Sequence, residues 1–181
     1  MSNTFPRSRK SKPGYDVDEV DDFLVLARRA YDSDRSDVVG LTARDIRHTA
    51  FRMTKGGYST VHVDAALERL EDAFASRERL IGGADPDAWF AQARETAQVV
   101  LNRLSRPDSR RFARTSVLTV GYNRQDVDAF GKRVTNYFQR NVPLSIDEVR
   151  TVVFRPQRGG YREQQVDLVL DSVIDVMLAV R

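Results

Sequence analysis

Apolar residues recur every three or four positions along most of this chain of 181 residues, which is the spacing of one buried face of an α-helix. The spacing predicts helices over residues 16–32, 58–80, 85–104, 122–138 and 161–180. The last helix has a nearly unbroken apolar seam, formed by Val166, Leu170, Val173, Met177 and Val180. Only residues 115–120 (TSVLTV) read as a clear strand. Because an isolated helix with such a seam is only marginally stable in water, the helices must pack together along their seams. The pattern predicts a mainly α-helical bundle with short extended or hairpin segments.

A short pattern, Gly-Tyr followed after four residues by Val-Asp, occurs four times. Its copies begin at Gly14, Gly57, Gly121 and Gly160. Four copies in one register indicate internal repetition. A segment with a Thr or Ser cap precedes two of the copies, at residues 41–46 and 144–149. We therefore expect four turn-helix units, internally duplicated as residues 1–83 and 84–181, with the boundary at Gly82-Gly83.

Each copy has the features of a turn that starts a helix. The residue after Tyr is expected at the N-cap, and the four caps are Asp16, Ser59, Asn123 and Arg162. Glu19 would complete a capping box in the first copy, and Tyr and Val occupy positions that pack together at helix starts. Gly suits either a positive φ or a close approach of two backbones. Capping does not require the Asp after Val, so the candidate functional residues are Asp21, Asp64, Asp128 and Asp167.

Composition narrows the class of protein. The absence of cysteine excludes a disulfide framework and suits a reducing cytoplasm. The chain start lacks the apolar segment of a secretory signal, and acids interrupt the apolar C-terminal run, so we expect no membrane span. Interspersed charges with a net charge of +3 are weak support for an anionic partner. We interpret residues 1–13, with Phe5 and several Arg and Lys residues, as an extended or partly disordered basic arm.

Catalytic patterns are absent from the sequence. His48 and His62 are its two histidines, and neither has a second ligand at metal-binding spacing. The acids near residues 16–22 cluster at a predicted helix start, where they complement the helix dipole. We therefore expect a protein that is not an enzyme and has neither a cofactor nor a metal site.

The capped segment, Phe-Arg and Gly-Tyr-x4-Val-Asp together resemble the N-terminal domain of the DivIVA and GpsB family. The likeness is strongest over residues 41–70 and 144–170 and partial over 14–31 and 121–138. Members of that family are bacterial scaffolds of cell division and polar growth, in which the turn-helix unit dimerises before a long coiled coil. The predicted helices here are too short for an extended coiled coil. We infer that copies within one chain pair with each other as pseudo-dimers, in a monomer or small homo-oligomer.

The resemblance implies two kinds of contact. GpsB-like proteins hold an arginine-bearing peptide of a cell-wall enzyme between the turn tyrosine, the Asp after Val and an acid one turn further. The matching sets here are Tyr58, Asp64 and Glu68, and Tyr161, Asp167 and Asp171. Paired carboxylates suit the planar donors of a guanidinium. The alternative is that each Asp accepts hydrogen bonds from the adjoining turn or pairs with Arg52 or Arg155.

DivIVA-like proteins also contact the membrane through an apolar and a basic residue before Gly-Tyr. Three copies have a basic residue at these positions, namely Lys12, Lys55 and Arg158. The remaining copy has Thr119-Val120 directly before its Gly-Tyr. Electrostatic attraction of such residues to anionic lipid contributes about 1 kcal/mol each. The leading interpretation is a cytoplasmic scaffold that recruits protein partners, and association with the membrane at the septum or pole is a further expectation. The alternatives are a peripheral membrane-surface protein and a nucleic-acid binder that uses Arg110, Arg111, Arg114 and the arm.

Overall fold

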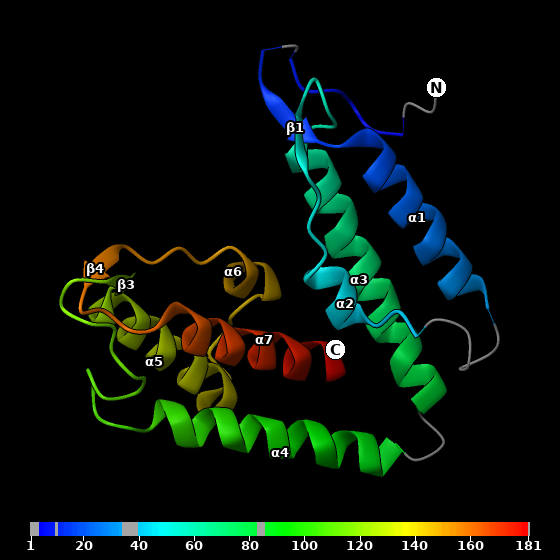
Figure 1. Ribbon diagram of the computed structural model, residues 1–181. Helices are drawn as coiled ribbons and strands as arrows, with labels where there is room; N and C mark the ends of the chain where they lie inside the picture. Colours follow the sequence, from blue (N-terminus) through cyan, green and yellow to red (C-terminus); the bar gives the residue numbers. More distant parts are fainter. Residues whose placement is uncertain (1–3, 10, 34–39, 83–85, 181) are drawn as a thin grey trace. The chain divides into compact units, whose positions relative to one another are not determined.

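The computed structural model describes residues 4–9, 11–33, 40–82 and 86–180 (Figure 1). The chain divides into two compact units, Met1–Ile81 (unit 1) and Gly82–Arg181 (unit 2), and both are mainly helical, as predicted. Among the helices of the described residues, none combines the length and hydropathy needed to cross a bilayer. The expected loop over 34–39, Gly83 of the expected boundary and the expected cap Asp85 lie outside the described residues.

The described residues of unit 1 form two long helices, one short helix and a pair of three-residue strands. In chain order these are β1 (Pro13–Tyr15), α1 (Val17–Asp32), α2 (Ala43–Arg47), β2 (Met53–Lys55) and α3 (Thr60–Gly82). The strands pair antiparallel, with Gly14 opposite Thr54. The two long helices run side by side from the end of the unit that carries the strands (Figure 1).

Unit 2 has the same order of elements after one additional helix. It consists of α4 (Pro86–Leu104), β3 (Val120–Tyr122), α5 (Arg124–Arg140), α6 (Ile146–Arg150), β4 (Pro156–Arg158) and α7 (Glu163–Ala179). The strands again pair antiparallel, with Gly121 opposite Gln157. The additional helix α4 packs along α7 and also contacts α5 (Figure 1).

The helices α1, α2, α5 and α6 have the expected N-caps, whereas one expected capping box is absent. Asp16 accepts hydrogen bonds from the N–H groups of Asp18 and Glu19, and Asn123 caps α5. The short helices α2 and α6 both begin with a complete capping box. The expected box of the first helix is wrong, because the Glu19 carboxylate accepts the backbone N–H of Arg52 at 2.8 Å.

The predicted strand over residues 115–120 is also wrong. The strand β3 contains only Val120 of that run and continues through Gly121 and Tyr122. Residues 116–119 form a turn, in which the Thr119 N–H donates to the Ser116 carbonyl at 2.9 Å. A strand exists only where a partner backbone lies beside it, and β4 provides just three residues. β-Branched side chains alone did not determine the conformation.

The N-terminal arm is packed against unit 1 and is not a solvated tail over its described residues. The Phe5 ring meets the Tyr58 ring edge to face, with 5.4 Å between centroids. Ser59 N–H donates to the Pro6 carbonyl at 2.9 Å, and Ser8 N–H donates to the Gly57 carbonyl at 2.8 Å. Phe5 is therefore half-buried against the core of unit 1.

Each unit has its own apolar core beneath the strand pair. In unit 1, Val20, Tyr58 and Val63 are at most 1% exposed. In unit 2, the corresponding valines Val127 and Val166 are similarly buried. Full burial of one such side chain stabilises the fold by about 1.5–3 kcal/mol. The cores hold the start of each long helix against the strands, which positions the site described next.

Candidate functional site

The two Gly-Tyr corners of each unit bind each other through their backbones. In unit 1 the N–H of Tyr15 donates to the carbonyl of Tyr58 at 2.9 Å, and the N–H of Tyr58 donates to the carbonyl of Tyr15 at 2.8 Å. Tyr122 and Tyr161 make the same exchange in unit 2, at 3.0 and 2.9 Å. The corners thus form one hydrogen-bonded pair in each unit.

Glycine precedes each tyrosine because the paired backbones approach closely. A Cβ on Gly14 or Gly121 would collide with the carbonyl oxygen of the facing tyrosine. Gly57 and Gly160 are crowded by the facing corner in the same way. Close approach, and not positive φ, is therefore the reason for these glycines.

The tyrosine hydroxyl of each corner binds the aspartate of the other corner's helix. Tyr58 Oη donates to Asp21 at 3.1 Å, and Tyr161 Oη donates to Asp128 at 3.0 Å. In the opposite direction, Tyr15 is hydrogen-bonded to Asp64 and Tyr122 to Asp167. The Asp after Val therefore acts in every copy as the acceptor for a tyrosine from the paired corner.

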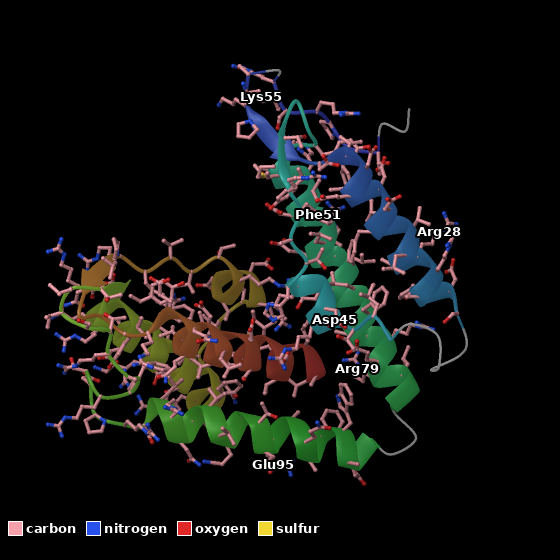
Figure 2. The ribbon with its side chains drawn as sticks, viewed as in Figure 1. Arg28, Asp45, Phe51, Lys55, Arg79 and Glu95 are labelled. Carbon is pink, nitrogen blue, oxygen red and sulfur yellow. The ribbon has the colours of Figure 1, made fainter. Side chains whose placement is uncertain are left out.

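The two tyrosines of a unit differ in exposure. Tyr58 and Tyr161 are 0% exposed, because Phe5 and Phe112 cover them. Tyr15 is half-buried, and its ring meets Phe51, a residue labelled in Figure 2, at 5.5 Å. Tyr122 is also half-buried, and the centroid of its ring lies 5.2 Å from that of the Phe154 ring.

The covering phenylalanines could have been recognised in the sequence. Phe5 and Phe112 each stand nine residues before the first Gly-Tyr of a unit, and an Arg follows two residues after each. Both phenylalanines precede the Gly-Tyr turn and therefore lie outside the repeat that the turn defines.

The predicted partner-binding sets must be regrouped. Tyr58 is buried against Asp21, so the tyrosine beside Asp64 is Tyr15. Asp64 is exposed, and Glu68 is half-buried one helical turn further along α3. We call Tyr15, Asp64 and Glu68 notch 1.

The second set changes in the same way. Tyr161 is buried against Asp128, and Tyr122 takes its place beside Asp167. Asp167 is exposed and Asp171 half-buried on the same face of α7. We call Tyr122, Asp167 and Asp171 notch 2.

Notch 2 has an excess of negative charge. Although the residue as a whole is exposed, partial burial of the Asp167 carboxyl raises its pKa. The hydrogen bond from Tyr122 lowers this pKa, and the charges of Glu163 and Asp171 raise it further. Burial and the negative charge of Asp167 raise the pKa of Tyr122 to about 12. A cation bound here would relieve the repulsion between Asp167 and Asp171.

The predicted alternative, that Arg52 and Arg155 pair with the aspartates after Val, is wrong. Arg52 binds Glu19 at 2.9 Å, and Arg155 Nε donates to Asp126 at 2.9 Å. Arg155 lowers the pKa of Asp126 through these hydrogen bonds. Both arginines thus bind first-turn acids of the facing helix and leave the notches to the tyrosines.

The predicted basic contacts lie at the strand ends of the two units. Lys12 and Lys55 are exposed at the same end of unit 1, where the Gly56 N–H donates to the Lys12 carbonyl at 3.3 Å (Figure 2). Arg158 is exposed in β4. Beside it the turn before β3 presents Val117 and Leu118, which are 78% and 84% exposed.

The arginines that motivated a nucleic-acid interface do not form one exposed patch. Arg111 is 6% exposed and Arg114 donates to the carbonyl of Ser109 at 3.1 Å. Arg110 is exposed. Within the described parts of the chain, no group of three or more His, Asp or Glu side chains is arranged to hold a metal ion.

Comparison of the chain with protein-family models, curated proteins and solved structures gave no match.

Proposed function

We propose that this protein is a non-enzymatic scaffold of the DivIVA type that recruits protein partners in bacterial cell division, polar growth or cell-wall synthesis. In this proposal each unit is an internal pseudo-dimer, and the chain is a duplication of a two-corner unit. The reciprocal backbone and tyrosine–aspartate bonds in both units support the proposal. So does the shared order of strand, long helix, capped short helix, strand and long helix.

The partner group is an arginine side chain, held at notch 1 and notch 2. The observation that carries this proposal is the pair of acids, one helical turn apart, beside a half-buried tyrosine in each unit. Two carboxylates at this spacing can accept both edges of a guanidinium, which an ammonium group cannot match in geometry. The exposure of Asp64 and Asp167 leaves them accessible to such a group.

The test is a titration of the isotope-labelled chain with a short peptide that has one arginine, followed by NMR. We expect shifts at Tyr15, Asp64, Tyr122 and Asp167, and none with a peptide that has neutral citrulline in place of arginine. The variants Asp64→Asn and Asp167→Asn should each weaken binding at their own notch about tenfold, the loss of roughly one charge-assisted hydrogen bond. Glu95→Gln, on the exposed face of α4 (Figure 2), is the control. Unchanged binding in both aspartate variants would rule out the notches.

A second candidate function is contact with an anionic membrane surface, where the protein would lie at the septum or pole. The observation that favours it is the exposed pair Val117 and Leu118 beside Arg158. Apolar side chains at a turn can enter the lipid interface while a nearby cation binds headgroups. Co-sedimentation with phosphatidylglycerol vesicles should fall in Leu118→Ser and at high salt. Equal sedimentation of Leu118→Ser and the unaltered chain would exclude this turn as the contact.

A further inference from the structure

Arg111 is a buried arginine whose planar group is bound on every side by unit 2. Its Nε donates to the Leu104 carbonyl at the end of α4 at 2.7 Å, and its Nη1 donates to the Asp128 carbonyl at 2.8 Å. Nη1 also lies 3.2 Å from the Asp128 carboxylate, and Nη2 lies 2.9 Å from Asp108. The Arg111 backbone N–H donates to Tyr161 Oη at 3.2 Å. These acceptors lie in the directions in which a planar guanidinium group presents its N–H donors.

Unit 1 has threonine at the corresponding position. Thr4 precedes Phe5 as Arg111 precedes Phe112. The Thr4 N–H donates to Tyr58 Oη at 3.2 Å, the same distance as the bond from Arg111 to Tyr161. Thr4 Oγ1 donates to Asp21 at 3.2 Å, where Arg111 meets Asp128 in unit 2.

The aspartates at these two positions differ in their surroundings. Asp128 is 4% exposed and accepts the Ser109 N–H at 2.7 Å in addition to Tyr161 and Arg111. Asp21 is half-buried, and the described residues that bind it are Thr4 and Tyr58, with no described arginine among them. One unit therefore supplies its own guanidinium to this aspartate and the other supplies a hydroxyl.

We infer that Arg111 is an internal ligand that closes the Asp128 site of unit 2, and that the Asp21 site of unit 1 is its open counterpart for a guanidinium from a partner. The inference rests on the proposed function only in the chemistry of the partner group. It makes the two units unequal. Unit 2 offers an arginine one site, notch 2, and unit 1 offers two, notch 1 and the Asp21 site.

Chemical rescue tests whether the Asp128 site is a guanidinium site. The variant Arg111→Ala removes the atoms that ethylguanidinium contains. We expect a lowered melting temperature that ethylguanidinium partly restores, whereas ethylammonium at equal concentration does not. The unaltered chain with each compound is the control for general solvent effects. Equal responses to the two cations would overturn the assignment.

A variant of unit 1 keeps the inference testable if Arg111→Ala does not fold. Thr4 is exposed, so Thr4→Arg should be tolerated and should place a guanidinium on Asp21. We expect its melting temperature to rise on the order of 4 °C, as for one additional charge-assisted bond in a domain of this size. The rise should disappear when Asp21→Asn is added. If the melting temperature of Thr4→Arg does not rise, or rises equally in the presence of Asp21→Asn, the assignment of an open site at Asp21 is refuted.

The same variant separates this inference from the proposed function. In the arginine-peptide titration, Thr4→Arg should abolish shifts at Asp21 and leave those at notch 1 and notch 2. If the peptide causes no shifts at either notch of the unaltered chain, the proposed function alone is refuted. The inference would still stand on the rescue of Arg111→Ala, which does not depend on a peptide. Persistent shifts at Asp21 in Thr4→Arg would refute the inference alone.

Discussion

Every aspartate of the Gly-Tyr-x4-Val-Asp pattern has the same partner, a tyrosine from the other corner of its unit. The helix start does not need this aspartate, and its role appears only when two corners are paired. In Asp128 the bond is buried, and in Asp167 it lies at an exposed notch. The same pair of side chains thus stabilises the fold on one side of the corner pair and leaves a carboxylate exposed on the other.

The buried bond should contribute more to stability than the exposed one. Tyr161→Phe leaves the 4%-exposed Asp128 without one of its donors, and this should cost about 1–3 kcal/mol in the free energy of unfolding. The matched change Tyr122→Phe leaves an aspartate that water can reach, and it should cost under about 1 kcal/mol. Urea denaturation of the two variants measures the difference. A larger loss in Tyr122→Phe would contradict this prediction.

The tyrosines of unit 2 should also make its stability depend on alkaline pH. Burial raises the pKa of Tyr161 and of Tyr122 to about 12, from an ordinary value of 10.0. The folded state therefore holds these protons more tightly, so their contribution is complete below pH 10 and is lost as the pH rises toward 12. The free energy of unfolding should fall over this range, and less so in a double Tyr→Phe variant. Ultraviolet absorbance of tyrosinate follows the titration, and equal slopes in both proteins would contradict the assignment.

The strands of this protein are consequences of pairing between corners. Each is three residues long. The strand that contains the first corner of a unit pairs with the strand that precedes the second corner. The long helices begin directly after the corners, so the pair of corners also sets which helix faces meet. An isolated two-stranded ribbon would be marginal in water, and here the tyrosine–aspartate bonds and the phenylalanine covers stabilise it.

Alanine at a corner glycine should therefore disrupt the pair. In Gly121→Ala the new Cβ would collide with the backbone carbonyl of Tyr161 and would also meet the side-chain methyl group of Thr115. The cost should lie near the upper end of the roughly 1–3 kcal/mol typical of overpacking. Gly40→Ala is the control, because nothing lies within 4 Å of its added Cβ. It should be neutral or stabilising by about 0.4–1 kcal/mol. Thermal unfolding compares the two, and equal midpoints would argue against close corner packing.

At the scale of the whole chain, each pair of corners is formed within one molecule. A family-like dimer would draw its two corners from separate chains and would become less stable on dilution. Here both corners of a pair are covalently joined, so the effective concentration of one for the other does not depend on protein concentration.

The unfolding midpoint should accordingly stay constant over a hundredfold dilution, which would lower the free energy of unfolding of an obligate dimer by about 2.7 kcal/mol. Circular dichroism at several protein concentrations measures the midpoint, and light scattering supplies the mass in solution. A midpoint that rises with concentration would show that folding depends on a second copy.

The sequence by itself determined the features that depend on neighbours along the chain. The helical periods predicted α1, α3, α4, α5 and α7 within a few residues, and the caps at Asp16, Thr42, Asn123 and Ser145 were correct. These predictions succeed because a helix and its cap are closed by bonds between residues at most four apart. The four copies also directed attention to the four aspartates that bind tyrosines of the facing corners.

Only the tertiary structure decided which tyrosine meets which aspartate. Asp64 and Tyr58 belong to one copy, yet Asp64 binds Tyr15 and Tyr58 binds Asp21, because the corners face each other in opposite directions. The docking of Phe5, the burial of Arg111 and the absence of a strand over 115–119 likewise depend on contacts between distant segments. Spacing along a chain specifies which side chains share a helix face, whereas their partners across the core depend on how the helices pack.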